Sequence, residues 1–132
     1  MIVLAADFGG TTIKLGVVSE GKLLAADRIP AQAERQMPDR LEAIAIRWEA
    51  MLADVGLKCT ACAATAFALP FLADPAKARV LGDFGKYPGA AQVDFADWAQ
   101  TRLGLPVALE NDLRVALLGE CAAGAAQGCQ DV

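Results

Sequence analysis

Residues 2–19 of the chain read IVLAADFGGTTIKLGVVS, and this stretch decides the fold. Its first part, Ile2 to Asp7, is an apolar run that ends in an acid before two glycines, which predicts a buried strand and then a tight turn. Its second part, Thr12 to Ser19, is rich in β-branched residues and predicts a second strand. A hairpin turn at residues 20–22 returns the chain as a third strand, Lys22 to Ile29. Three strands joined by short turns form an antiparallel meander.

The remaining residues predict helices that pack on a sheet. The clearest helix runs from Pro38 to Val55, because its apolar residues recur at spacings of three and four. The other predicted elements are a strand from Cys59 to Ala66, a loop from Phe67 to Ala91, a helix that Asp94 caps and Gly104 ends, a strand from Pro106 to Leu109, and a last helix from its Asn111 cap to about Ala123. The predicted fold class is α/β, with a mixed β-sheet whose first three strands are the antiparallel meander. This order resembles the ribonuclease H-like lobe of the actin and hexokinase superfamily and lacks the strict alternation of a Rossmann domain.

The composition excludes several kinds of partner. Of the 132 residues, 55% are hydrophobic and 21% charged, which suffices for one packed domain. The formal charge of −4 gives no basis for nucleic-acid binding, which needs clustered Lys and Arg. No apolar run approaches the roughly 20 residues of a membrane span, and the N-terminus lacks the basic region of a signal peptide, so we expect a cytoplasmic protein without a membrane partner. The chain has no histidine, which excludes a histidine base or metal ligand from these residues.

Four cysteines raise the question of zinc or redox chemistry. Cys59 and Cys62 have CxxC spacing, whereas Cys121 and Cys129 lie far along the chain. On the predicted strand, residues three positions apart point to opposite faces, which is poor geometry for chelating a metal. We therefore expect buried, inert thiols.

The first candidate site is the turn between the first two strands, DFGGTTIK at residues 7–14. Consecutive glycines let a backbone approach a ligand and direct N–H groups at its oxygens, and the hydroxyls of Thr11 and Thr12 add donors. A carboxylate at a strand end, here Asp7, can hold Mg²⁺ directly or through water. The stretch is neither a Walker A loop nor the G-x-G-x-x-G dinucleotide fingerprint. An ordinary hairpin turn with Asp7 as a solvated acid explains it equally well, so both interpretations stay open.

The second candidate site lies in LPVALENDLRVALLGE, residues 105–120. Asn111 and Asp112 stand where a strand passes into a helix, and they fit a plain helix cap followed by a first-turn acid. They also fit a binding site, because the carboxyl ends of strands in α/β sheets face the ligand crevice. Asp112, kept ionised by the helix N-terminus, could accept the proton of a substrate hydroxyl that attacks the γ-phosphate of ATP. Asn111 offers both a donor and an acceptor to sugar hydroxyls.

Together and in this order, the two motifs are similar to those of the ROK family of bacterial sugar kinases, and the resemblance covers nearly the whole chain. It implies an enzyme that phosphorylates a primary hydroxyl of a hexose such as glucose, using ATP and Mg²⁺. It implies that Asn111 and Asp112 bind the sugar, that Asp112 is the catalytic base, and that Asp7 binds Mg²⁺ through water. The residues that the resemblance assigns to the ATP phosphates are Asp7, Gly9, Gly10, Thr11, Thr12 and, at a basic position of the motif, Lys14.

The sequence departs from the family pattern after the fourth strand. Relatives carry Pro-Gly there, in a loop that borders the sugar, whereas this chain has Phe71 after Pro70. A ring at that position either reshapes the sugar pocket or fills the core. The loop from Gly82 to Gly89 falls in the same region, and we expect Lys86 and Tyr87 to occupy an ordinary surface loop.

The resemblance also implies a second lobe that residues 1–132 do not contain. In the family, that carboxyl-terminal lobe carries a second glycine-rich turn, the adenosine pocket, further sugar contacts and a cysteine-rich zinc motif. We therefore expect residues 1–132 to be the amino-terminal ATPase-like and sugar-binding lobe, inactive alone, with structural zinc only if the other lobe carries that motif. An uncovered apolar face would favour self-association, which leaves a homodimer open.

Two other functions stay open at this point. One is the effector-binding domain of a sugar-responsive ROK repressor, although such repressors begin with a helix-turn-helix and here a strand begins beside Met1. The other is a different ATPase or kinase of the actin-like superfamily. Such a protein would share the Asp7 turn but has no evident need for Asn111 and Asp112.

Overall fold

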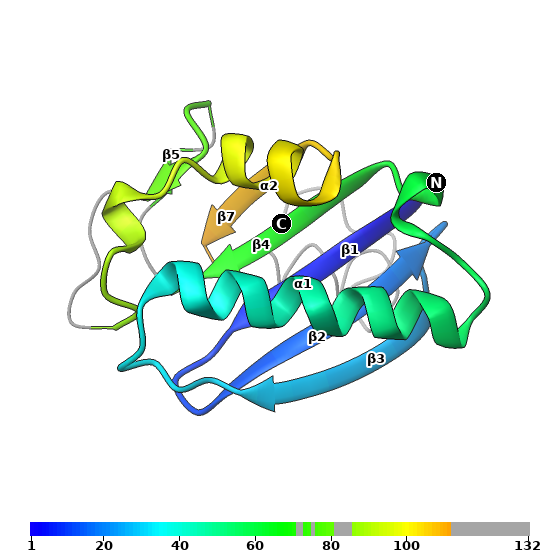
Figure 1. The fold of residues 1–132 in the computed structure, drawn as a ribbon, viewed down its shortest axis with the longest axis horizontal. Coiled ribbons are helices and arrows are strands. Elements are labelled where there is room, and N and C mark those ends of the chain that lie inside the picture. The colour runs from blue at the N-terminus through cyan, green and yellow to red at the C-terminus, as the bar shows by residue number, and fades with distance from the viewer. Residues whose placement is uncertain (71–72, 75, 81–85, 112–132) are drawn as a thin grey trace, which may run out of the picture.

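The computed structural model describes residues 1–70, 73–74, 76–80 and 86–111 (Figure 1). Over these residues the elements are a main sheet, a two-stranded ribbon, two α-helices and two 3₁₀ turns. In chain order their bounds are β1 (Ile2–Phe8), β2 (Thr12–Ser19), β3 (Lys22–Pro30), α1 (Met37–Asp54), η1 (Cys59–Ala61), β4 (Ala64–Leu69), β5 (Ala73–Asp74), β6 (Arg79–Val80), η2 (Ala90–Gln92), α2 (Phe95–Leu103) and β7 (Val107–Asn111).

The main sheet has the strand order β3-β2-β1-β4-β7. Strand β2 pairs antiparallel with both β1 and β3, which confirms the predicted meander. The β2–β3 turn places Glu20 and Gly21 at positive φ angles of 51° and 75°, as a two-residue type I′ hairpin requires. Strand β4 pairs in parallel with β1, and β7 pairs in parallel with β4. The predicted mixed sheet is confirmed, and the carboxyl ends of β1, β4 and β7 meet at one edge.

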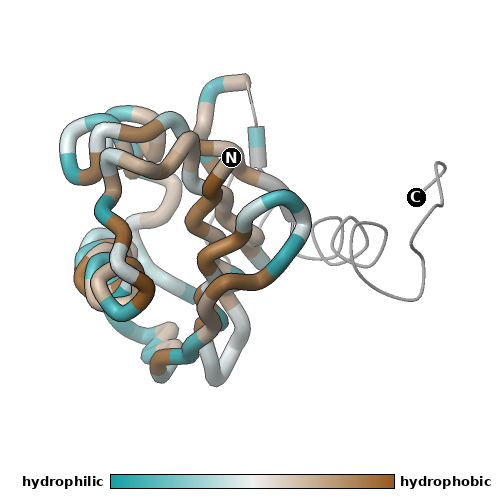
Figure 2. The backbone as a smooth tube through the Cα atoms, turned by 90° about the vertical axis from the view of Figure 1, so that its right-hand side faces the viewer, coloured by the Kyte–Doolittle hydropathy of each residue, from teal (hydrophilic) through white to brown (hydrophobic). Residues whose placement is uncertain are grey.

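Helices α1 and α2 cover one face of the sheet (Figures 1 and 2). Phe67 of β4 is the centre of the core between them, with ring centroids of four aromatic residues 5.6 to 5.9 Å from its own. One of these is Trp48 of α1, whose Nε1 donates a hydrogen bond to the carbonyl oxygen of Ala5 at 3.2 Å. Arg102 of α2 donates to Glu42 and Glu49 of α1, so an ion-pair bridge joins the two helices at their surface.

The opposite face of the main sheet is lined mostly by small side chains, and no described helix covers it. A groove of about 530 Å³ lies over β1, β2 and β3 on this side. Its residues are Ala5, Ala6, Asp7, Lys14, Leu15, Gly16, Val18, Leu23, Ala26, Asp27, Arg28 and Ala66. The charged members lie toward the end of β1 where the glycine turn begins.

The strand predicted from Cys59 to Ala66 is displaced. The N–H of Cys62 bonds back to the carbonyl oxygen of Cys59 at 3.0 Å and closes the turn η1, so β4 begins only at Ala64. It continues to Leu69, because these apolar residues are buried between β1 and β7. In a 3₁₀ turn, residues i and i+3 lie on the same side, so the strand-based argument that separates Cys59 from Cys62 is wrong.

The two described thiols are also less buried than expected. Cys59 and Cys62 are both free and half-buried. Burial, as the largest cause, raises the pKa of each thiol above its ordinary value. Both groups therefore stay protonated at neutral pH, which fits the inert role predicted for them. Cys121 and Cys129 lie outside the described residues.

The structure confirms one further prediction about the elements and corrects another. Asp94 caps α2 as predicted, since its carboxylate accepts a hydrogen bond from the N–H of Asp97 at 3.0 Å, and Gly104 ends the helix at a φ of 72°. The predicted loop from Phe67 to Ala91 is wrong in part, because it contains the end of β4, the ribbon β5–β6 and the turn η2. Phe71 and the helix predicted beyond Asn111 lie outside the described residues. Neither described α-helix is long and apolar enough to cross a membrane.

Candidate functional site

The turn after β1 is shaped by the close approach of its own backbone. The N–H of Gly9 donates to the carbonyl oxygen of Thr12 at 3.0 Å, and a Cβ atom at Gly9 would lie 2.6 Å from that oxygen. No side chain fits at that distance, so residue 9 has to be glycine. The carbonyl oxygen of Thr11 accepts from the N–H of Ala31 at 3.0 Å, which fixes the other side of the turn to the end of β3.

These bonds decide which donors the turn can offer to a ligand. The N–H of Gly9 is used inside the turn. Within the part of the chain that the structure describes, the N–H groups of Gly10 and Thr11 bond to no protein acceptor. Thr11 is exposed and Thr12 is half-buried at the start of β2. Two unused N–H groups and two hydroxyls in a short turn suit an anion with several oxygens.

Asp7 lies just before this turn with its side chain on the open face of the sheet. It is exposed, and it lies opposite Lys14, which in turn lies opposite Arg28 on β3. Cross-strand partners share a face, so one carboxylate and two cations line the same row. Lys14 and Arg28 are both exposed. Lys14 therefore stands beside the predicted metal ligand rather than in the core.

The donor set around Asp7 suits Mg²⁺ better than a metal held by protein ligands alone. Mg²⁺ takes oxygen ligands, keeps several waters, and is held by one or two carboxylates together with substrate phosphates. An exposed carboxylate next to a turn with unused N–H donors fits that pattern. Over residues 1–70, 73–74, 76–80 and 86–111, no three or more His, Cys, Asp or Glu residues gather closely enough to hold a metal by themselves. The site thus fits a metal that arrives with a phosphate ligand.

The second predicted site lies at the same edge of the sheet. The backbone register places Asp7 beside Ala68 of β4, and Ala68 beside Glu110 of β7, with Asn111 as the last residue of that strand. Strands β1 and β7 are two steps apart, which is about 10 Å at the usual strand spacing. Asn111 therefore stands across β4 from the glycine turn, and Asp112, the predicted base, lies outside the described residues.

Tyr87 is the part of the site that the sequence reasoning missed. The residue is fully buried, against the expectation of a surface loop, and its Oη donates to the carbonyl oxygen of Gly9 at 2.6 Å. Its ring meets that of Phe8 edge-on with centroids 5.2 Å apart. Burial is the main reason that the pKa of Tyr87 rises to about 12, so the hydroxyl is a permanent donor at neutral pH. The only sign of this role in the sequence is a tyrosine among glycines and a proline, and that composition is also typical of loops.

Tyr87 also adopts an unusual backbone conformation. Its φ angle is 50°, a left-handed value that costs a bulky residue about 1–3 kcal/mol. Two backbone bonds hold this segment in place, from the N–H of Tyr87 to the carbonyl oxygen of Ala33 at 2.6 Å and from the N–H of Met37 to that of Pro88 at 2.8 Å. The contacts around the turn thus compensate for local strain, as is common at binding sites.

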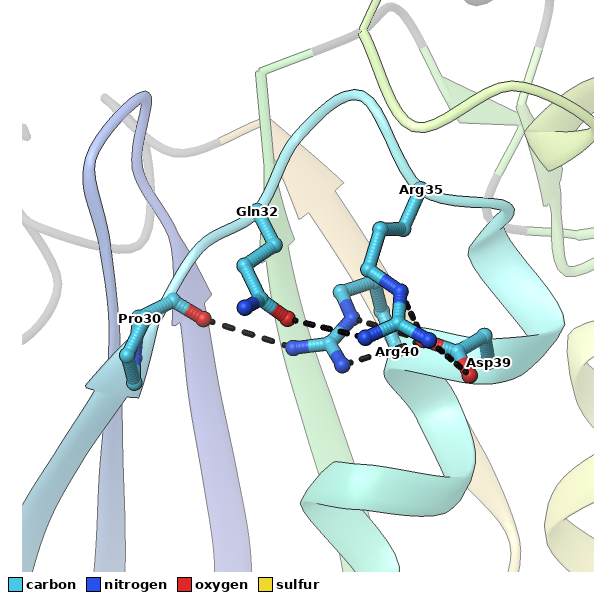
Figure 3. A network of polar contacts seen from close by, with 5 residues as sticks. All are labelled: Pro30, Gln32, Arg35, Asp39 and Arg40. Atoms are coloured by element: carbon cyan, nitrogen blue, oxygen red, sulfur yellow. Dashed lines mark hydrogen bonds and ion pairs between the residues drawn. The ribbon is translucent and has the colours of Figure 1, made fainter.

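A polar network supports the turn from the side of α1 (Figure 3). Arg40 is almost fully buried, and it donates to the carbonyl oxygen of Pro30 at 3.4 Å and to the carboxylate of Asp39. Arg35 donates to Gln32 and to the same carboxylate. The network joins the end of β3 to the first turn of α1. Because the N–H of Ala31 bonds to the carbonyl oxygen of Thr11, the network also stabilises the segment that holds the glycine turn.

Known proteins that resemble this chain in sequence and in structure are ROK family proteins and sugar kinases. The sequence model described as "ROK family" matches residues 3–132. A beta-glucoside kinase from Klebsiella pneumoniae is 30% identical over 123 residues, which cover 91% of this chain and 37% of that protein. A ROK hexokinase from Thermus thermophilus matches with a TM-score of 0.77 and 27% identity, over 97% of this chain and 39% of its own. A ROK family glucokinase from Streptomyces griseus, solved in complex with glucose and AMPPNP, matches with a TM-score of 0.71 and 28% identity, over 97% and 38%.

These likenesses confirm the predicted fold class. The described sheet and helices have the architecture of the ribonuclease H-like lobe found in the actin and hexokinase superfamily. The chain spans less than two-fifths of the length of each of these three relatives.

Proposed function

This chain belongs to the ROK family, and from that premise we propose that it is the phosphate- and sugar-binding lobe of an ATP-dependent hexose kinase. The reaction would transfer the γ-phosphoryl group of ATP to a primary hydroxyl of glucose or a similar sugar. Because ATP is the phosphoryl donor, the protein would act in the cytoplasm. The adenosine pocket and further sugar contacts would belong to a second lobe, since the relatives are much longer than residues 1–132.

One observation supports this proposal above the others. The glycine turn after β1 and the end of β7 lie at the same edge of the sheet, with β4 between them. A spacing of about 10 Å leaves room for a phosphoryl group on one side and the attacking hydroxyl on the other. Substrates of open α/β sheets bind at this kind of edge.

The turn would bind and orient the triphosphate. The N–H groups of Gly10 and Thr11, with the hydroxyls of Thr11 and Thr12, would donate to its oxygens. Gly9 would hold the turn in shape, and Asp7 would hold Mg²⁺ through water. When bound, Mg²⁺ neutralises negative charge on the phosphates. A protein with a net charge of −4 needs such positive charge close to the phosphates.

The other end of the site would bind and activate the sugar. Asn111 would hold sugar hydroxyls, and Asp112 would accept the proton from the hydroxyl that attacks. In that step the hydroxyl oxygen forms a bond to the γ-phosphorus, the bond to the bridging oxygen breaks, and ADP leaves. Phosphoryl transfer depends mainly on alignment and charge neutralisation, so a carboxylate of ordinary pKa suffices as the base.

The test is a coupled assay of ADP formation with the complete gene product that contains residues 1–132. The substrates are ATP, Mg²⁺ and a panel of glucose, mannose, fructose, N-acetylmannosamine and a β-glucoside. We expect turnover with at least one of these sugars and none with residues 1–132 alone. The Asp112→Asn variant should lose at least about a thousandfold in kcat, the upper part of the range for a lost proton-transfer group, and still bind the sugar.

Two results would contradict the proposal. Absence of turnover with every sugar would remove the kinase assignment. Full activity of Asp112→Asn would show that another group accepts the proton. The matched control is Asp54→Asn at the end of α1, far from the glycine turn, which should leave kcat unchanged.

A further inference from the structure

Lys86 brings a positive charge to the glycine turn from a distant part of the sequence. Its Nζ lies 3.6 Å from the position that a Cβ atom at Gly10 would take. Gly10 is one of the two residues whose backbone N–H is unused within the described part of the chain. An ammonium group and an unused donor therefore stand at the same side of one turn.

The position of this lysine is set by its neighbours. Tyr87, the next residue, is tied to the carbonyl oxygens of both Gly9 and Ala33 at 2.6 Å. Pro88 accepts a hydrogen bond from the N–H of Met37 at the start of α1. One of these bonds holds the segment beside Lys86 against the glycine turn, and the other two hold it against Ala33 and the start of α1.

The charge of Lys86 is also available for a ligand. The side chain is exposed, and it takes part in none of the ion pairs formed among the described residues. Lys14 and Arg28 lie in the row of Asp7 on the face of the sheet. Lys86 instead reaches the turn from the segment that Tyr87 anchors.

We propose that Lys86 binds the terminal phosphate of the nucleotide triphosphate that occupies the glycine turn. The proposal deepens the proposed function and rests on it. A lysine is a point charge with three donors, and it suits a phosphate whose remaining oxygens accept the N–H groups of Gly10 and Thr11. The terminal phosphate is the group that moves, so Lys86 would neutralise charge where the transfer occurs.

The test is isothermal titration of the complete gene product with a non-hydrolysable ATP analogue, ADP and glucose, each with Mg²⁺. For Lys86→Met we expect about tenfold weaker binding of the ATP analogue, the effect of losing one charged hydrogen bond to phosphate. Binding of ADP and glucose, which lack the transferred phosphoryl group, should change less than about twofold. Lys86→Arg should restore most of the affinity, because it keeps the charge.

The matched control is Lys58→Met. Lys58 is exposed like Lys86, but it lies beside the carboxyl half of α1, whose other end is next to Pro88. This variant should bind every ligand like the wild type. Thermal unfolding should be the same for all three variants, which separates a lost ligand contact from a lost fold.

The outcomes distinguish this proposal from the kinase assignment. Equal affinity of wild type and Lys86→Met for the ATP analogue, in a protein that phosphorylates a sugar, overturns the role of Lys86 alone. Weaker binding of ADP to the same degree also overturns it, because the contact would not be with the terminal phosphate. A wild type that phosphorylates no sugar overturns the kinase assignment, while titration with inorganic tripolyphosphate still decides whether Lys86 binds the terminal phosphate.

Discussion

The hydroxyl of Tyr87 donates a 2.6 Å hydrogen bond to the carbonyl oxygen of Gly9, a residue 78 positions earlier in the chain. This bond fastens the loop before α2 to the turn after β1. The two residues also meet through Phe8, whose ring lies edge-on to that of Tyr87. The shape of the candidate phosphate turn therefore depends on a segment that is remote in sequence.

Replacing Tyr87 by Phe should destabilise the protein and weaken nucleotide binding. The ring would keep its packing, but the carbonyl oxygen of Gly9 would lose its partner in a buried place. We expect the free energy of unfolding to fall by about 1–3 kcal/mol, measured by urea denaturation. The KM for ATP should rise severalfold while the KM for the sugar changes little. An unchanged unfolding midpoint would show that water replaces the lost hydroxyl at no cost.

The ionisation of Tyr87 can be followed directly, because it is the only tyrosine in the chain. Tyrosinate absorbance at 295 nm should appear around pH 12 in the folded protein and near pH 10 in urea, since burial raises the pKa of this residue to about 12. A folded-state titration near pH 10 would contradict the buried position of the hydroxyl.

The same shift predicts how stability depends on alkaline pH. Below pH 10 the phenol is protonated in both the folded and the unfolded state, so it contributes no pH dependence. Between pH 10 and 12 the unfolded state ionises first, and the free energy of unfolding should fall by up to about 1.4 kcal/mol per pH unit. Tyr87→Phe should lack this component. Parallel alkaline curves for wild type and variant would argue against the raised pKa.

Alanine substitutions at the two glycines of the turn should differ in how much they reduce stability. A Cβ at Gly9 would lie 2.6 Å from the carbonyl oxygen of Thr12, so Gly9→Ala should cost about 1–3 kcal/mol, measured by thermal or urea unfolding. A Cβ at Gly10 would meet only the end of the Lys86 side chain at 3.6 Å. Gly10→Ala should therefore stay within about 1 kcal/mol of the wild type. Equal losses at both positions would show that the turn is shaped differently.

The thiols of Cys59 and Cys62 should react slowly at neutral pH. Burial raises the pKa of both, so a smaller fraction is thiolate than in an unstructured peptide of the same sequence. Alkylation by iodoacetamide at pH 7.5, quantified for each residue by mass spectrometry, should be slower than in that peptide and should accelerate as the pH rises. Urea should remove the difference. Faster reaction in the folded protein would point to an activated thiol.

Local pattern was sufficient for most of the fold. The apolar run of β1, the β-branched residues of β2, the glycine at the β2–β3 turn and the Asp94 cap are each short-range features, and each forms as predicted. The sequence pattern did not predict where β4 begins, because the residues there are small. The run from Cys59 to Ala64 has no alternation that could mark where a strand begins, and burial between β1 and β7 decides where β4 lies.

The candidate site also has parts that the sequence predicted and parts that it did not. The sequence alone marked Asp7, the glycine turn and Asn111 as chemically suited residues, because their types and spacing are visible in the chain. It could not show that Tyr87 is buried under Gly9 or that Lys86 reaches Gly10, since loop-like residues carry no periodic signal. Those contacts join positions almost 80 residues apart, and only the packing of the sheet, α1 and the loop before α2 brings them together. Secondary-structure preferences depend on adjacent residues and can be predicted from the sequence. The shape and charge of the glycine turn depend on long-range packing, which the sequence does not show.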